Sequence, residues 1–320
     1  MLLVKRKIIA VGIAWDWGYD REFVDCLEKA CWEQKLSSYL IHSYNIDDVT
    51  EKVKQKEFIF KSLFDRASDT NSRFTPFIQQ LSSSKTIFVN PKNHSLIAED
   101  KAILHFHFLK NQIPVPHTII LNPHKDEPPL EIMKALENFK KPFVVKPSKG
   151  GGGEGVWKHV HSLSDICRIR LEHQDDRYLV QEEVSPLIID NKRGWIRAYF
   201  AYGKVYYCWW NELTHIYNFV TQEEEKIHKF FKKINRIMKK IAAVVNLNFF
   251  SSEFVLTEEN NLVVVDYVND PCDMRLKSIH QTGVPDHLVK TLASNIIDAL
   301  SKELHNNKKI SKPSKKQKKR

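Results

Sequence analysis

The chain has 320 residues, of which 42% are hydrophobic and 28% are charged, as in an ordinary globular protein with a large buried core. Its apolar runs are far shorter than a membrane span, its first residues lack the apolar segment of a secretory signal, and its five cysteines are scattered without a CxxC pair. These features argue against a membrane-spanning protein and against a disulfide or zinc framework. They predict a cytoplasmic protein with reduced thiols.

The positive charge of the chain is concentrated at its end. Of the formal net charge of +10, eight positive charges lie in residues 308–320, which leaves +2 for the rest of the chain. A segment this basic has nothing to bury, so residues 306–320 are predicted to be a disordered tail. Such a tail can make a weak contact with a polyanion or simply remain solvated.

Apolar strands alternate with helical patterns in the first part of the chain. Strands are predicted over residues 7–14, 38–43, 58–63 and 85–89, and a helix over residues 21–34. This alternation indicates a small parallel α/β domain over residues 1–95. Ligands of such sheets bind at the carboxyl ends of the strands, so Asp16, Asp20 and residues 65–73 are candidate substrate contacts, with helix caps or turns as the alternative.

A second region begins at Asn90-Pro91. A helix is expected over residues 99–112 and ends at the proline-rich residues 113–116. A strand over 118–121 and a helix over 128–138 follow.

A glycine-rich hairpin comes next, with the sequence KPFVVKPSKGGGGEGVW over residues 141–157. Strands at 143–145 and 156–160 flank Lys149 and the five glycines Gly150, Gly151, Gly152, Gly153 and Gly155. Successive glycine amides can turn toward an anion at close range, and Lys149 adds a positive charge. The segment is not a P-loop, because no Gly-Lys-Ser/Thr and no helix follow the glycines. A long surface loop is the alternative.

The remaining elements form strand pairs around a long helix. Strands are predicted at 178–184, at 196–201 and 204–210 around Tyr202-Gly203, and at 251–257 and 262–268. The long helix covers 221–246 and begins with a capping box of Thr221 and Glu224. A closing helix covers 285–304.

Two carboxylates are predicted to face each other in the last strand pair. A turn centred on Glu259-Asn260 places Glu253 opposite Asp266, where side chains lie about 5 Å apart. Like charges at that distance destabilise a sheet unless a cation lies between them, and Mg²⁺ prefers oxygen ligands. A one-residue error in the register, or a lysine that pairs with the carboxylates, is the alternative.

In this order the motifs resemble the ATP-grasp superfamily, in its D-alanine ligase and glutathione synthetase-like branch. The resemblance implies an α/β fold with a pre-ATP-grasp domain at 1–95 and an ATP-grasp domain at 96–305, divided near residue 185. It implies that Lys101, Lys146, Lys149 and the glycines bind ATP, and that Gln181, Glu182, Glu183 and Val184 form the adenine hinge. Arg197 and Lys149 would be catalytic, and Glu253, Asp266 and Asn269 would hold Mg²⁺.

The sequence departs from the family pattern near the metal. The family usually ends this strand with Glu-x-Asn, whereas here Asn269 stands three residues after Asp266 and faces away unless the strand bulges. Asp270 has the right parity. Trp195 stands where the family often has Asp, and the segment of Trp209, Trp210 and Asn211 replaces the usual Arg-and-Asn segment.

The resemblance implies a carboxylate–amine ligase that uses ATP and an acylphosphate, with small-molecule substrates and often a homodimer. A small-molecule kinase and a nucleotide-binding protein without turnover are the alternatives. The cations Arg66, Arg73 and Arg275 would favour a phosphorylated acceptor, whereas acids such as Asp69 and Asp273 would favour an amine.

Overall fold

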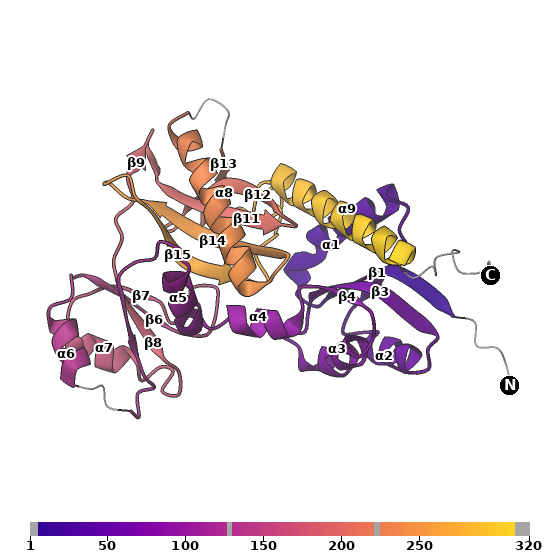
Figure 1. Cartoon of the computed structure of the whole chain (residues 1–320), viewed down its shortest axis with the longest axis horizontal. Coiled ribbons are helices and arrows are strands. Elements are labelled where there is room, and N and C mark those ends of the chain that lie inside the picture. The colour runs from indigo at the N-terminus through magenta and orange to yellow at the C-terminus, as the bar shows by residue number, and fades with distance from the viewer. Residues whose placement is uncertain (1–5, 127–129, 221–224, 311–320) are drawn as a thin grey trace, which may run out of the picture. The chain divides into compact units, whose positions relative to one another are not determined.

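The computed structural model describes residues 6–126, 130–220 and 225–310, without the side chains of residues 225–226 and 307–310. These residues form two compact units (Figure 1). Unit 1 comprises residues 1–90 and 273–320, and unit 2 comprises residues 91–272. The predicted capping box at Thr221 and Glu224 and the tail after residue 310 lie outside the described residues.

Unit 1 is built on a parallel four-stranded sheet, as its alternating pattern predicts. The strands are β1 (Lys7–Trp15), β2 (Ser38–Ile41), β3 (Phe58–Arg66) and β4 (Ile87–Val89), in the order β2-β1-β3-β4. Nearly every residue of β1 after Ile8 is buried or half-buried, because helices cover both faces of the sheet.

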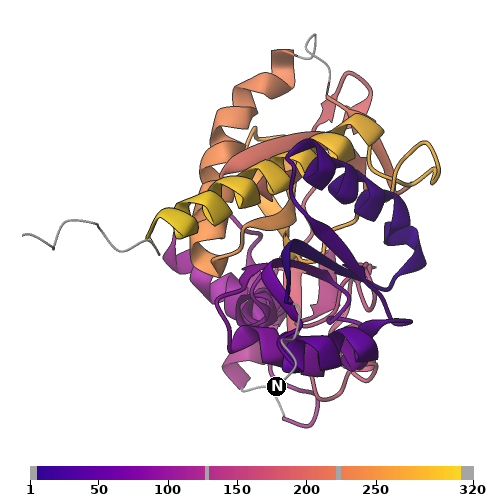
Figure 2. The same cartoon turned by 90° about the vertical axis from the view of Figure 1, so that its right-hand side faces the viewer.

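The helices of unit 1 lie in two layers. Helices α1 (Arg21–Glu33) and α9 (Asp286–Ile310) pack against each other on one side of the sheet, and α2 (Ile46–Lys54) and α3 (Thr75–Ser82) lie on the other (Figures 1 and 2). Short 3-10 turns, η1 (Gly18–Asp20) and η2 (Ser72–Phe74), precede α1 and α3. The closing helix thus belongs to the same compact unit as the first strands. The two compact units divide the chain by spatial contacts and not by domain. The predicted domain boundaries at residues 95 and 305 therefore stay predictions.

Unit 2 contains two antiparallel sheets. The first has the order β5-β8-β6-β7, with β5 (Thr118–Leu121), β6 (Phe143–Pro147), β7 (Trp157–Val160) and β8 (Tyr178–Glu182). Helices α6 (Leu130–Glu137) and α7 (Leu163–Ile169) contribute to the core on one face of this sheet. The opposite face carries Lys146, Leu179 and Gln181, and Leu179 joins the core of the second sheet.

The second sheet has the order β13-β12-β11-β14-β15. Its strands are β11 (Trp195–Ala201), β12 (Lys204–Asn211), β13 (Ile216–Phe219), β14 (Phe249–Leu256) and β15 (Leu262–Asn269). A small hairpin of β9 (Ile188–Ile189) and β10 (Lys192–Arg193) precedes it. Helix α8 (Glu225–Val245) buries its apolar stripe on one face of this sheet. The predicted helix at 99–112 corresponds to α5 (Lys101–Lys110), which Asp100 caps, and a short helix that was not predicted, α4 (Lys92–Ala98), precedes it.

The register of β14 and β15 differs from the prediction near the turn and agrees with it at the carboxylates. A turn centred on Glu259-Asn260 would place Leu262 opposite Thr257, but Leu262 faces Leu256, so the turn is one residue longer than expected. A bulge between Phe254 and Glu253 adds one residue to β15 and brings Glu253 opposite Asp266. A second irregularity brings Asn269 opposite Ser251.

None of the described helices is both long enough and apolar enough to cross a membrane.

Candidate nucleotide and metal site

The glycine loop connects β6 and β7, which pair as an antiparallel hairpin. Gly150, Gly152 and Gly153 have φ angles of +95°, +65° and +82°, which side chains other than glycine rarely adopt. A Cβ placed on any of them would meet no atom within 4 Å, so backbone conformation and not space requires glycine here. Gly155 has both constraints, because its φ is +68° and a Cβ added to it would lie 3.1 Å from the Pro147 ring. The loop is therefore an exposed turn with its backbone amides accessible to a ligand.

The start of α5 is tied to the base of this loop. The Asp100 carboxylate caps α5 by accepting from the Ile103 amide at 3.0 Å, and it also accepts from the Ser148 hydroxyl at 2.5 Å and from Arg177 at 2.6 Å. The Lys101 Nζ donates to the carbonyl of Gly150 at 2.5 Å. The two halves of the predicted ATP motif, Asp100-Lys101 and the glycine loop, therefore lie together although about fifty positions separate them in the sequence.

Lys146 lies on the inner face of the first sheet and reaches the strand that carries Asp266. Its Nζ donates to the carbonyl of Val265 at 2.9 Å and lies 5.3 Å from the centre of the Tyr267 ring. Val265 is the extra residue at the bulge, so its carbonyl is available to a side chain. Burial lowers the pKa of Lys146 to about 8, although the charges of Asp266 and Glu253 act in the opposite direction.

The side chain of Gln181 links the two sheets. Its Nε2 donates to Thr118 Oγ1 at 2.9 Å and to the Tyr267 hydroxyl at 3.0 Å. The Tyr267 hydroxyl also lies 2.7 Å from His105 Nδ1, and burial together with the charge of Lys146 lowers the pKa of His105 to about 4. His105 is therefore a neutral hydrogen-bonding group near pH 7.

The rest of the predicted hinge has its backbone partly engaged. The amides of Glu182 and Glu183 donate to the carbonyls of His117 and Pro142 at 2.9 and 3.3 Å. The Glu183 carboxylate lies 3.0 Å from His159 Nδ1. The amide of Val184 donates to no other backbone group in the described part of the chain, which leaves it available to a ligand.

Arg197 and Glu253 form a buried ion pair across β11 and β14. They are direct neighbours in the register and are 8% and 7% exposed. The second carboxylate oxygen of Glu253 accepts from Trp195 Nε1 at 2.9 Å. The Arg197 guanidinium also lies 5.1 Å from the ring centre of Trp210. Trp195 thus supplies a hydrogen bond to the acidic residue of the next strand.

Asp266 is surrounded by positive charge. Burial alone would raise its pKa, but the charges of Lys101 and Lys146 outweigh burial and hold the pKa below its usual range. The Asn269 amide nitrogen donates to Asp266 Oδ2 at 2.8 Å, so the irregular strand brings Asn269 to the same side as Asp266. Asp270 instead accepts from the Ser95 hydroxyl at 2.6 Å.

The donor set of this cluster fits Mg²⁺. Glu253, Asp266 and Asn269 offer only oxygen ligands to a cation, as a hard divalent ion requires. Rotation of the Asn269 amide would turn its oxygen toward the same point. No group of three or more His, Cys, Asp or Glu side chains among the described residues is arranged for a metal, so a site here would depend on the asparagine and on ligand oxygens. The repulsion between the two carboxylates is already offset by Arg197, Lys101 and Lys146. The alternative in which a lysine pairs with the carboxylates is therefore compatible with a metal site.

Three buried hydrogen-bond donors on the same face have no protein partner within the described residues. They are Arg197 Nε, the Tyr199 hydroxyl and the Ser251 hydroxyl. Tyr199 and Ser251 are 0% exposed and face each other across β11 and β14, and Tyr199 is two residues from Arg197. Buried polar groups are rarely left unpaired, so these donors are open to a water molecule or a polar ligand.

The candidate substrate residues of unit 1 are already paired. Asp20 forms a buried ion pair with Arg66 at 2.7 Å, and Asp16 accepts from Asn71 at 2.7 Å and from the Ser43 amide at 3.2 Å. Two other cations have acidic partners as well, since Arg73 pairs with Asp47 and Arg275 with Asp273. These side chains organise the carboxyl edge of the parallel sheet.

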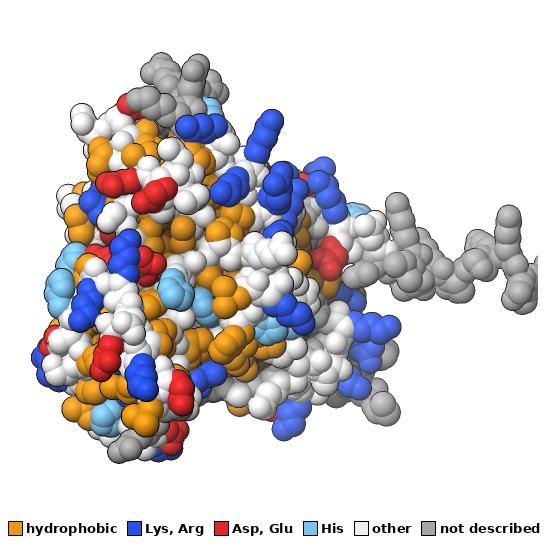
Figure 3. Space-filling view, turned by 60° about the vertical axis from the view of Figure 1, so that its left-hand side comes forward, with side chains coloured by type: hydrophobic (Ala, Val, Ile, Leu, Met, Phe, Trp, Pro, Cys, Tyr) orange, Lys and Arg blue, Asp and Glu red, His pale blue; other side chains and the backbone are white. Residues whose placement is uncertain are grey.

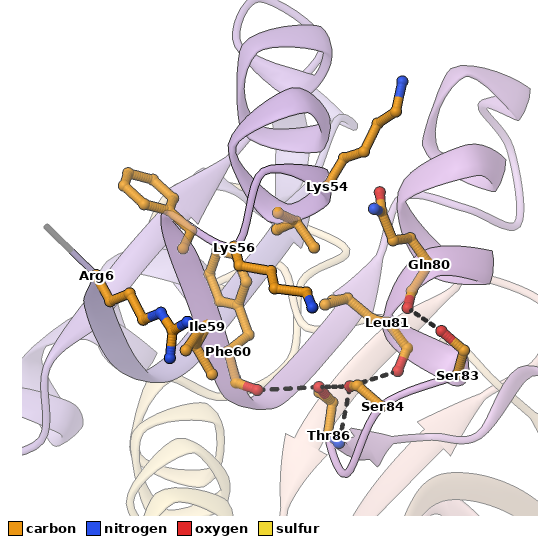
Figure 4. Close-up of a pocket in the computed structure, with 12 residues that line it drawn as sticks. Arg6, Lys54, Lys56, Ile59, Phe60, Gln80, Leu81, Ser83, Ser84 and Thr86 are labelled. Atoms are coloured by element: carbon orange, nitrogen blue, oxygen red, sulfur yellow. Dashed lines mark hydrogen bonds between the residues drawn. The ribbon is translucent and has the colours of Figure 1, made fainter. Parts of the chain in front are cut away.

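A cavity of about 280 Å³ in unit 1 lies at the opposite edge of that sheet, beside the first residues of β3 (Figure 4). Its hydroxyl groups are already used, since Ser83, Ser84 and Thr86 donate to the backbone carbonyls of Gln80, Leu81 and Phe60. It is separate from the predicted ATP residues, all of which belong to unit 2.

Sequence reasoning missed several residues of the site. It did not find the contacts of Ser148 and Arg177 with Asp100, the Trp195–Glu253 hydrogen bond, or the Tyr267 hydroxyl between Gln181 and His105. The alternation of apolar and polar residues could not predict these contacts, because each contact depends on which segments become neighbours in the fold.

Comparison with solved structures decides the fold. The RimK domain ATP-grasp protein of Sphaerobacter thermophilus superposes with a TM-score of 0.61 at 18% identity, over 90% of this chain and 98% of that one. The D-alanine–D-alanine ligase of Bacillus anthracis complexed with ATP gives 0.65 at 14% identity, over 95% and 100%. This chain has the ATP-grasp fold.

A third ATP-grasp structure contains ligands. The ligase PsnB, in a complex with a minimal precursor, Mg and ADP, has a TM-score of 0.59 at 12% identity and covers 92% of this chain and 98% of its own. No family model and no curated protein sequence matches the chain significantly. The predicted fold class is thus confirmed by structure, at identities too low for sequence comparison to detect.

Proposed function

We propose that the protein is an ATP- and Mg²⁺-dependent ligase that joins a carboxylate to an amine through an acylphosphate. One observation carries this proposal: Lys101, which is hydrogen-bonded to the glycine loop, and Lys146 both lie close enough to Asp266 for their charges to lower its pKa. Cations and free backbone amides beside an acidic pair are what a magnesium–nucleotide complex needs.

ATP would be held by groups that differ in their tasks. Lys146, Lys101 and Lys149 would neutralise the phosphates, and Gly150 to Gly155 would close over them through backbone amides. The base would meet Gln181, the carbonyl of Glu182 and the amide of Val184, which donates to no other described backbone group. Mg²⁺ would be held by Glu253, Asp266 and Asn269, and when bound it would neutralise charge on the phosphates.

The unpaired donors suggest where the substrate carboxylate lies. Arg197 Nε, the Tyr199 hydroxyl and the Ser251 hydroxyl are buried on the face that carries Glu253. Three donors without a nearby acceptor suit an anion, and Arg197 would also stabilise the charge that develops as the phosphoryl group moves. No cysteine or histidine nucleophile is required, since the reaction depends on alignment and charge.

The kinase alternative loses support from the ion pairs of unit 1. Arg66, Arg73 and Arg275, the cations that would bind a phosphorylated acceptor, each pair with an aspartate. A nucleotide-binding protein without turnover remains the second candidate, because Glu253 has both oxygens engaged by Arg197 and Trp195.

Thermal melts test the nucleotide site first. The protein and Lys146→Ala would be compared with ATP and Mg²⁺, with ATP and a chelator, and with GTP and Mg²⁺. A rise in Tm that needs Mg²⁺ and disappears in the variant supports the site. No shift under any condition contradicts it.

A turnover assay then distinguishes the ligase, the kinase and the binding protein. ADP release would be screened with carboxylates and amines, alone and together, in the presence of hydroxylamine. A hydroxamate that forms with a carboxylate and ATP supports the ligase. A stable phosphorylated product without amine identifies a kinase, and ATP binding without ADP release identifies a binding protein.

We further propose a cytoplasmic location and small-molecule substrates, with a homodimer and tail contacts with polyanions as open expectations. All five cysteines are free thiols in the structure, which suits a reducing compartment.

A further inference from the structure

The outer face of helix α8 carries a row of cations. Its side chains Lys229, Lys232, Lys233, Arg236 and Lys239 are exposed or half-buried, and Lys240 is half-buried. Residues 226–252 contain no Asp or Glu at all. Figure 3 shows Lys and Arg side chains gathered in a band over this helix.

Among the described residues, these cations have no acidic partner. Lys240 donates to the carbonyl of Asn111 at 3.1 Å and Lys229 lies over the ring of Phe230. In the described part of the chain, Lys232, Lys233, Arg236 and Lys239 form no ion pair. Exposed lysines elsewhere in the chain often pair with an acid one turn away, as Lys52 does with Asp48 and Lys302 with Asp298.

The arrangement works against the helix itself. Lys229 with Lys233, Lys232 with Arg236, and Arg236 with Lys240 are like charges four residues apart, a spacing that destabilises a helix. The helix dipole does not compensate for this repulsion, because none of these cations lies in the last turn of α8. Burial of the apolar stripe holds α8 in place, which leaves the outer face free for another role.

We propose that this face of α8 binds the phosphate backbone of a nucleic acid. The six cations from Lys229 to Lys240 span ~16 Å along a rigid helix, and electrostatic contact with phosphates requires no base recognition. The basic residues 308–320 give the same chain a second set of cations for the same kind of ligand.

Other polyanions fit this face less well. A membrane-surface helix inserts an apolar face, whereas the large apolar side chains of α8, such as Ile234 and Ile241, are buried in its own unit. The core of a protein–protein interface is depleted in lysine and enriched in aromatic residues, and the exposed α8 residues are almost all Lys or Arg.

The test measures binding of the full chain to a labelled 20-base-pair DNA and a 20-nucleotide RNA by fluorescence anisotropy, from 50 to 200 mM NaCl. The variant combines K232Q, K233Q, R236Q and K239Q, since glutamine preserves helix propensity. The control combines K29Q, K35Q, K54Q and K61Q, which removes the same charge from positions of unit 1. A further variant lacks residues 308–320.

The expected result is at least a tenfold loss of affinity for the α8 variant at 100 mM NaCl. The slope of log K against log salt should fall by about 3 to 4, while the control retains its slope. Equal losses in both variants, or a loss confined to the tail deletion, would overturn the proposal. Equally tight binding to phosphatidylserine vesicles or to poly-glutamate would also overturn it. Unchanged circular dichroism of the α8 variant excludes misfolding, and ATP binding does not enter the test.

Discussion

At the scale of single residues, the charge of Lys146 decides how the site responds to pH. Burial lowers its pKa from 10.5 to about 8. Between these two values the unfolded chain binds a proton that the folded chain lacks, so this group makes the free energy of unfolding rise with pH from about 8 to 10.5. Below pH 8 both states carry the proton, and the cost of burying the charge is fully present.

Nucleotide binding should depend on pH in the opposite direction. The ammonium form of Lys146 is the one that attracts phosphate, so the affinity for ATP and Mg²⁺ should fall above pH 8, by up to about tenfold per pH unit. Calorimetric titrations at pH 7, 8 and 9 would measure it. Lys146→Arg, which stays charged throughout, is the control and should show no such fall. Parallel pH profiles for the two proteins would rule out this role of Lys146.

The pair of Glu253 and Arg197 makes a second prediction. The sequence alone suggests that removing a carboxylate here relieves repulsion, but in the structure Glu253 neutralises a buried guanidinium. Glu253→Gln should therefore lower the free energy of unfolding by about 3–5 kcal/mol, because Arg197 stays buried after it loses its ion-pair partner.

Urea denaturation of Glu253→Gln and of the double variant Glu253→Gln, Arg197→Met measures this effect. The double variant should recover much of the loss, since it removes both charges. If Glu253→Gln alone proves as stable as the parent or more stable, repulsion from Asp266 outweighs the ion pair.

At the scale of elements, the glycine loop offers a matched pair of substitutions. Gly153 has φ +82°, whereas the φ of Gly151 lies outside the left-handed region, and a Cβ meets no atom within 4 Å at either position. Gly153→Ala should weaken ATP binding by about 5- to 30-fold through roughly 1–2 kcal/mol of backbone strain. Gly151→Ala should have little effect.

Titration of both variants with ATP and Mg²⁺ checks this prediction. A similar loss in both would mean that the ligand needs the space above the loop and not its conformation. The contrast is informative because the sequence shows only a run of glycines, in which all positions look alike.

The strand pair of β14 and β15 shows how far local sequence can predict a site. The turn placed at Glu259-Asn260 was enough to put Glu253 opposite Asp266, although the predicted turn was one residue too short. The bulge at Val265 compensated, and the next irregularity brought Asn269 beside Asp266. Bulges leave no periodic signal, so neither correction could be predicted from the strand pattern.

At the scale of the whole molecule, the motifs in their order resemble the ATP-grasp superfamily, and this resemblance predicted the fold, whereas pairing between distant segments was missed. The short helices α2, α3 and α7 were not located, since each spans only two or three turns. The packing of α9 against α1 joins segments more than 250 residues apart and has no sequence signal. The net charge did not reveal the cluster of cations on α8, because acidic residues elsewhere in the chain cancel their positive charge in the sum.

The division into units predicts where nucleotide changes the protein's dynamics. Every residue proposed to bind ATP or Mg²⁺ lies between Pro91 and Cys272, and the sheet of unit 1 supplies none. Ligand that binds only the folded state of unit 2 stabilises that unit by mass action. ATP and Mg²⁺ without other substrates should therefore slow amide hydrogen exchange in residues 143–160, 178–184 and 249–269, and leave residues 7–66 unchanged.

Hydrogen exchange followed by mass spectrometry resolves these segments directly. The same experiment with ATP and a chelator is the control, and it should protect the hinge residues 178–184 more than residues 249–269, because only the latter carry the proposed metal ligands. Protection that extends over β1 and β3 would show that nucleotide binding is coupled to unit 1. The carboxyl edge of that sheet carries Asp16, Asp20 and Arg66, which are already paired. Such coupling would mean that these residues respond to ATP binding as well as to a second substrate.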